Sequence, residues 1–109
     1  MTQPTWDLLV RNVQVVRPGV EGTFAGDIAV SDGKVTEVGA DLDPTAAAEV
    51  VEGGGRLAVP GAVDAHFHMG IYNPLSEDAD SESRAAAQGG VTTALNYMRT
   101  GAYYLNKGG

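Results

Sequence analysis

The sequence contains no cysteine, which excludes a disulfide framework and a metal site built from thiolates. A chain without cysteine fits a reducing compartment, so we expect a cytoplasmic protein. The N-terminus also lacks a basic segment followed by an apolar core, which is the pattern of a secretory signal. No run reaches the length of about eighteen apolar residues that a membrane helix needs. The sequence therefore predicts a soluble protein.

Positive charge is scarce as well, because 7 Lys and Arg residues face 14 Asp and Glu residues, for a formal net charge of −7. No basic cluster is available to neutralise phosphates, so neither a nucleic acid nor an anionic membrane surface is an expected partner. The hydrophobic share of 43% is ordinary for a globular protein. A chain of 109 residues can in principle bury a core.

Extended runs recur along the first half of the chain, at residues 7–16, 26–31, 34–39, 49–52 and 56–59. The pair Pro18-Gly19 marks a turn after the first run, which predicts one or two short strands before it. A brief helical turn is expected within residues 41–48. Three glycines at 53–55 break the pattern, and no phosphate-loop lysine follows them, which favours a turn over an anion cradle. Residues 1–58 are therefore expected to form an all-β unit of hairpins.

The strongest local signal in this half is Asp32-Gly33. A two-residue Asp-Gly link between strand-like runs favours a type I′ hairpin, because its glycine accepts positive φ. We expect a hairpin here.

Both histidines of the chain lie in the segment 60–68, which has the sequence PGAVDAHFH. If this segment is a strand, Asp64, His66 and His68 share one face and apolar residues occupy the other. Two imidazoles at i and i+2 can point their ring nitrogens at a common point, and neutral imidazole suits zinc and neighbouring transition metals. A metal site is one interpretation. A pair of polar side chains on an exposed strand face is the other.

A helix is predicted over residues 76–88, with Ser76 as a candidate cap, an acidic first turn and an Ala-rich body that stops at Gly89-Gly90. Its carboxylates are expected to face solvent rather than to form catalytic pairs. Residues 91–98 are again strand-like. Strand, helix and strand follow one another over the length of a βαβ unit with a right-handed crossover.

Two motifs carry a family resemblance. The segment 60–68 resembles the P-G-x-[IV]-D-x-H-x-H signature of the amidohydrolase superfamily. The segment 84–93, RAAAQGGVTT, resembles the R-A-A-A-x-G-G-V-T-T that follows it in the cyclic amidases, namely hydantoinases, dihydropyrimidinases, allantoinases and dihydroorotases. The resemblance covers the whole chain, but only the beginning of the family's sequence.

The resemblance implies an α/β fold that starts a metal-dependent (β/α)8 barrel. Residues 1–58 would be the N-terminal part of a small β-sandwich, completed in the family by strands from the far C-terminus. Residues 59–109 would supply the first βαβ portion of the barrel, which takes roughly 200 to 250 residues when complete. We therefore expect an N-terminal piece of a longer enzyme, or a truncated or split product, that is inactive alone.

The resemblance also implies a cofactor. His66 and His68 would bind the more buried ion of a mononuclear or binuclear centre, usually zinc, and metal-bound hydroxide would attack a cyclic amide. The remaining ligands, a carboxylated lysine, two further histidines and an aspartate, would come from later strands. Asp64 would accept a hydrogen bond from the other ring N–H of a ligating histidine, or it would only pack against the strand. None of the residues present is expected to be a general acid or base.

Substrate choice depends on departures from the family's patterns. Dihydroorotases carry H-x-H-x-R, whereas Gly70 stands at the arginine position here, and Arg99 stands opposite the asparagine of their M-P-N-T. Both departures favour a hydantoinase-like or dihydropyrimidinase-like enzyme. Arg99 is a candidate for binding an anionic substrate group, and an arginine that only flanks the strand is the alternative.

Other functions stay open. A heterocycle aminohydrolase of the same superfamily shares the H-x-H strand, and a non-catalytic homologue could serve as a scaffold. The expected partner is a small cyclic amide, and the full-length enzyme is expected to form a homodimer or homotetramer.

Overall fold

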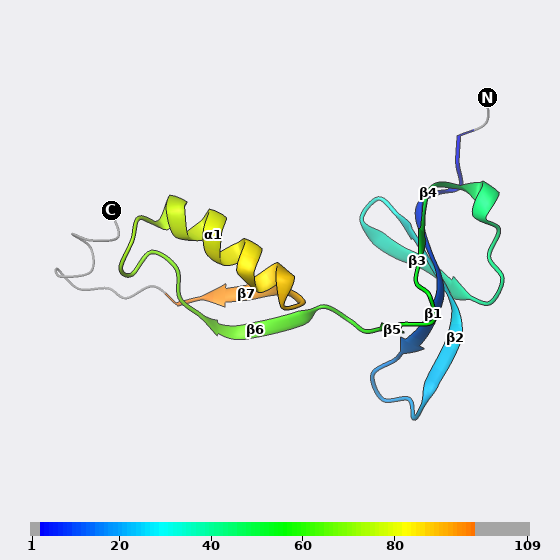
Figure 1. The fold of residues 1–109 in the computed structure, drawn as a ribbon, viewed down its shortest axis with the longest axis horizontal. Coiled ribbons are helices and arrows are strands. Elements are labelled where there is room, and N and C mark those ends of the chain that lie inside the picture. The colour runs from blue at the N-terminus through cyan, green and yellow to red at the C-terminus, as the bar shows by residue number, and fades with distance from the viewer. Residues whose placement is uncertain (1–2, 98–109) are drawn as a thin grey trace. The chain divides into compact units, whose positions relative to one another are not determined.

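A computed structural model describes residues 3–97. The chain divides into two compact units, Met1–Pro60 and Gly61–Gly109, drawn in Figure 1. Strands make up most of the regular secondary structure of the described residues, with a single α-helix. The elements are β1 (Trp6–Val16), β2 (Thr23–Ser31), β3 (Lys34–Gly39), the 3₁₀ helix η1 (Pro44–Ala46), β4 (Ala47–Glu52), β5 (Leu57–Ala58), β6 (Ala62–Phe67), α1 (Leu75–Gln88) and β7 (Val91–Asn96). Within residues 3–97, no helix combines the length and apolarity needed to cross a membrane.

The first unit is a sheet with the strand order β3-β2-β1-β4, and β5 also pairs with β1. The expectation of hairpins holds for β1 with β2 and for β2 with β3, which are antiparallel. It is wrong for β4 and β5, which run parallel to β1. After β3 the chain returns through η1 to the start of β1, so that Ala47 pairs with Trp6 and the last strands follow β1 in its own direction.

The predicted hairpin between β2 and β3 is confirmed. Ser31 pairs with Lys34, and Asp32 and Gly33 between them have φ values of 51° and 71°. Positive φ at both central residues is what a type I′ turn requires.

A bulge in β1 explains why β4 and β5 are separate strands. The register against β2 shifts between Val10 and Val13, and Asn12 has a φ of 54°. The glycine turn meets this bulge, since the N–H of Gly53 donates to the carbonyl of Arg11 at 2.7 Å and that of Gly55 to Asn12 at 2.7 Å. A Cβ on Gly53 would lie only 2.6 Å from the Arg11 oxygen, so the close approach requires glycine.

Carboxylates complete the hydrogen bonding of this bulge. The buried Asp27 accepts the N–H of Asn12 at 2.8 Å through one oxygen and that of Leu42 at 3.0 Å through the other. Glu52 accepts from the Asn12 side-chain amide at 2.9 Å and from the N–H of Gly54 at 3.1 Å. The Asn12 bond and then the Gly54 bond lower the pKa of Glu52, because both stabilise the ionised carboxylate.

The core of the first unit consists of Leu9, Val13, Val15 and Ala29. The β1 residues among them lie at odd positions, and Ala29 lies opposite Leu9 on β2. Alternation along the strands therefore sets which side chains are buried.

The second unit contains β6, α1 and β7, and the two strands pair in parallel, with Ala62 opposite Val91. The predicted strand–helix–strand order is confirmed by these elements. The helix starts one residue before the predicted range, and the expectation of a Ser76 cap is wrong. Pro74 is the N-cap residue and makes no side-chain cap bond. Its fixed φ favours a helix start without one.

Candidate metal site

The two histidines converge at the end of β6. His66 lies within the strand and His68 directly follows it. Their Nε2 atoms are 3.0 Å apart, and the rings meet edge to face with centroids separated by 4.8 Å. Two ligands of one tetrahedral zinc ion, each about 2.0–2.1 Å from the metal, have nitrogens about 3.3 Å apart. The two Nε2 atoms would therefore have to move apart only slightly to bind a single ion.

The other ring nitrogen of His68 has a backbone partner. Its Nδ1 lies 2.9 Å from the carbonyl oxygen of Tyr97, the residue after β7. A carbonyl can only accept, so Nδ1 carries a proton, and in the neutral imidazole Nε2 then keeps its lone pair. Ligating histidines usually have such a partner on the nitrogen that does not bind the metal.

Asp64 contacts His66 through the main chain. One carboxylate oxygen accepts the backbone N–H of His66 at 3.0 Å, so the contact reaches the peptide of His66 and not its ring. The ring of His66 instead packs against that of Tyr97, with centroids 4.9 Å apart and planes inclined by 30°. Tyr97 thus contacts both histidines.

The loop after His68 is fixed by side chains from the neighbouring elements. The side-chain oxygen of Asn96 accepts the N–H of Met69 at 2.8 Å. Asp78 on α1 accepts the N–H of Gly70 at 2.9 Å and the side-chain amide of Asn73 at 3.2 Å. The expectation that the acidic first turn faces solvent is therefore wrong for the half-buried Asp78, because the loop supplies donors to its carboxylate.

The sequence predicts that His66 and His68 lie together, but it does not predict the contacts of Tyr97 and Asn96 with this segment. The pairing of parallel strands was a usable signal, because β6 and β7 end on the same edge and the residues after them become neighbours. Arg99, the candidate substrate-binding residue, lies outside the described residues. Among residues 3–97, no group of three or more His, Cys, Asp or Glu side chains could hold a metal ion. The described part thus offers two imidazoles as candidate ligands.

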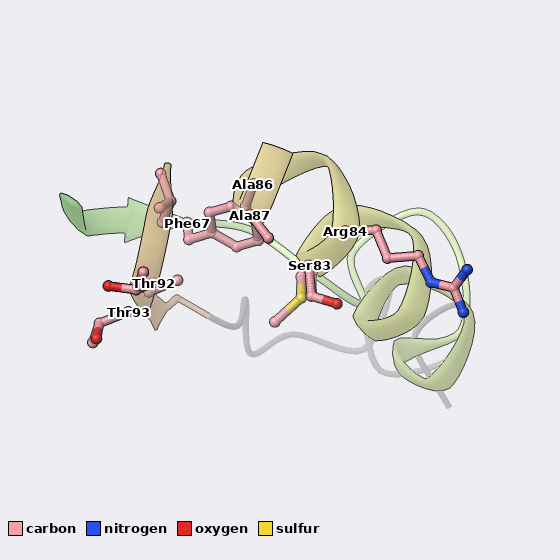
Figure 2. A pocket seen from close by; sticks show the side chains of 10 residues that line it. Phe67, Ser83, Arg84, Ala86, Ala87, Thr92 and Thr93 are labelled. Atoms are coloured by element: carbon pink, nitrogen blue, oxygen red, sulfur yellow. The ribbon is translucent and has the colours of Figure 1, made fainter. Parts of the chain in front are cut away.

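A hollow of about 560 Å³ lies between α1 and β7, with Phe67, Ala86 and Ala87 among the lining residues. Figure 2 shows these side chains around the hollow, with the guanidinium of Arg84 directed away from them. Neither histidine lines it. The two histidines therefore lie at the ends of the strands and not in this hollow.

Comparison with known proteins shows which proteins this chain is similar to. A dihydropyrimidinase 2 from Caenorhabditis briggsae is 32% identical over 94 residues, covering 84% of this chain and 18% of that protein. An L-hydantoinase from Paenarthrobacter aurescens is 37% identical over 94 residues, covering 83% and 20%. The solved structure of an L-hydantoinase (dihydropyrimidinase) from Arthrobacter aurescens matches with a TM-score of 0.73 and 32% identity, over 86% of this chain and 21% of that one. No family model matches the sequence.

Further relatives at similar identity are named dihydroorotase and allantoinase. All of these names denote hydrolases of cyclic amides. The chain is therefore homologous to these cyclic amidases. It corresponds to the N-terminal part of these relatives, and it spans between 18% and 26% of their length.

Proposed function

We propose that this chain is the N-terminal part of a metal-dependent hydrolase that cleaves the C–N bond of a small cyclic amide. The observation that carries the proposal is the pair of Nε2 atoms of His66 and His68, which lie 3.0 Å apart with a backbone acceptor on His68 Nδ1. Similarity to dihydropyrimidinases and hydantoinases supports the substrate class.

The two units have different roles in this proposal. Residues 1–58 contribute strands to a small β-sandwich, and residues 59–109 begin a (β/α)8 barrel. The parallel pairing of β6 with β7 around α1 supports the second assignment, because βαβ units build such barrels. Catalytic groups of these barrels lie at the C-terminal ends of the strands, where His66 and His68 are found.

His66 and His68 would hold zinc through Nε2, together with ligands outside the 109 residues that include a carboxylated lysine. A zinc ion held there would polarise an amide carbonyl and activate water near neutral pH. The other residues of this chain orient the two histidines. The Tyr97 carbonyl keeps the proton of His68 on Nδ1, and the Asp64 carboxylate accepts the backbone N–H of His66.

Substrate choice follows from two positions. Gly70 provides no cation two residues after His68, which favours a hydantoinase-like or dihydropyrimidinase-like substrate over dihydroorotate. Arg99 is proposed to bind an anionic or imide oxygen of the substrate, since a guanidinium recognises such groups by charged hydrogen bonds. The enzyme is proposed to act in the cytoplasm as a homo-oligomer.

Substitution of the histidines tests the metal site. In the full-length enzyme, His66→Ala and His68→Ala should each abolish turnover and lower the metal content per chain, because each change removes a ligand. Metal content is measured by elemental analysis after purification. Arg84→Ala is the control, because Arg84 makes an exposed ion pair with Asp80 on the surface of α1, and such pairs contribute little.

Normal metal content and turnover in both histidine variants would make the pair ordinary polar residues of a strand end. Absence of both metal and turnover from the unmodified protein would favour a scaffold homologue.

A further inference from the structure

We infer that Tyr97 is the positioning residue of the proposed metal site, with its carbonyl group fixing His68 and its ring fixing His66. The inference rests on the proposed function, because it concerns the same two histidines. Tyr97 does not meet substrate or metal in this role; it acts through the two imidazoles.

The backbone N–H of Tyr97 is itself held in place. The N–H of Tyr97 donates to the carbonyl of Phe67 at 2.8 Å, which continues the pairing of β6 with β7 beyond the last residue of β7. One residue earlier, the side chain of Asn96 accepts the N–H of Met69 at 2.8 Å. Hydrogen bonds from the end of β7 therefore flank His68 on both sides, at Phe67 and at Met69.

In the neutral form of His68, the Tyr97 carbonyl determines the tautomer. With the proton on Nδ1, the lone pair of His68 Nε2 points at His66 Nε2 across 3.0 Å. Without a metal, His66 must then donate the proton of that contact, because two lone pairs would repel. His68 thus presents its ligating nitrogen before any ion arrives.

The ring of Tyr97 restricts His66. The side chain of His66 is exposed, and the two residues lie nearly flat against each other, at 4.9 Å between centroids and 30° between planes. Removing the flat neighbour would free the imidazole to turn about its side-chain bonds, and metal binding would then have to overcome that entropy. A phenyl ring provides the same flat surface, so the hydroxyl of Tyr97 is not required.

Cobalt affinity of the full-length enzyme tests the ring. Tyr97→Ala should weaken Co²⁺ binding, measured by competition with a chromophoric chelator, by roughly tenfold or more, as for other residues that orient metal ligands. Tyr97→Phe should bind like the unmodified protein. Tyr72→Ala is the matched control, because Tyr72 is 75% exposed in the loop of the same unit. Circular dichroism of each variant verifies its folding.

A second measurement needs no substitution. The imidazole ¹⁵N shifts of the metal-free protein should show His68 protonated at Nδ1 and unprotonated at Nε2. The opposite tautomer would overturn the role of the carbonyl, even if Tyr97→Ala failed to fold.

The outcomes separate this inference from the proposed function. Equal cobalt affinity of a folded Tyr97→Ala and the unmodified protein, with binding lost in His66→Ala, would reject Tyr97 as a positioning residue and keep the metal site. Unchanged affinity in His66→Ala as well would reject the metal site itself.

Discussion

The two units of the chain differ in how much apolar surface they bury. The first unit buries Leu9, Val13, Val15 and Ala29, whereas Ile71 is the one buried hydrophobic residue in the described part of the second. The second unit instead leaves strand residues exposed, with Val63 65% and Leu95 54% accessible. A sheet of two strands has little stability of its own. We therefore expect the first unit to carry the stability of this chain and the second unit to carry its chemistry.

The polar groups of the two units also differ, because those of the first unit stabilise the fold and those of the second are the candidate site. In the first unit the buried Asp27 uses both oxygens to accept backbone N–H groups, which is a structural role. In the second unit the exposed rings of His66 and His68 turn their Nε2 atoms toward each other. A satisfied carboxylate stabilises a fold, while the two converging imidazole nitrogens are the groups proposed to bind a cation.

A matched pair of leucines gives the largest expected contrast. Leu9 on β1 is completely buried and Leu95 on β7 is 54% exposed. In the 109-residue chain, Leu9→Ala should lower the free energy of unfolding by about 2–5 kcal/mol, because it opens a cavity. Leu95→Ala should change it by no more than about 0.5 kcal/mol. Urea unfolding is followed by fluorescence of Trp6 on β1, the single tryptophan of the chain, and by the circular dichroism of α1.

Equal losses for the two leucines would mean that the second unit has a core comparable with that of the first. The same pair in the full-length enzyme sharpens the comparison. If further polypeptide covers β7 there, Leu95→Ala becomes costly in that context alone.

A smaller effect is expected at Asp27. Asp27→Asn leaves one of the N–H groups of Asn12 and Leu42 facing an amide nitrogen in place of an oxygen, so unfolding free energy should fall by about 1–3 kcal/mol. Asp43→Asn is the control, because Asp43 is an exposed residue whose carboxylate caps η1 at Thr45. The decrease in unfolding free energy for Asp43→Asn, measured from the Trp6 fluorescence transition, should be clearly smaller. A larger loss at Asp43 would remove the distinction between a buried and an exposed carboxylate.

Local signals explain what the sequence could predict. The hairpin at Asp32-Gly33 needs only positive φ at two adjacent residues, and the turn at 53–55 needs only glycine. The segment that carries His66 and His68 is also local, since two residues on one strand face converge by geometry alone. These features depend on few neighbours, so periodicity and turn chemistry were sufficient.

Nonlocal contacts explain what it could not predict. The parallel pairing of β1 with β4 joins Trp6 to Ala47, and no turn residue specifies such a pair. The bulge at Asn12 depends on acceptors from Asp27 and Glu52, which lie far away in the sequence. Tyr97 contributes its backbone carbonyl to His68, and a main-chain group leaves no residue-type signal.

The most direct test of the account locates the metal in the full-length enzyme. Anomalous X-ray diffraction at the absorption edge of the bound metal should place an ion about 2.0–2.1 Å from Nε2 of both His66 and His68. The Nδ1 atom of His68 should remain hydrogen-bonded to the Tyr97 carbonyl in that structure. An ion bound elsewhere, with the two imidazoles still hydrogen-bonded to each other, would contradict the account.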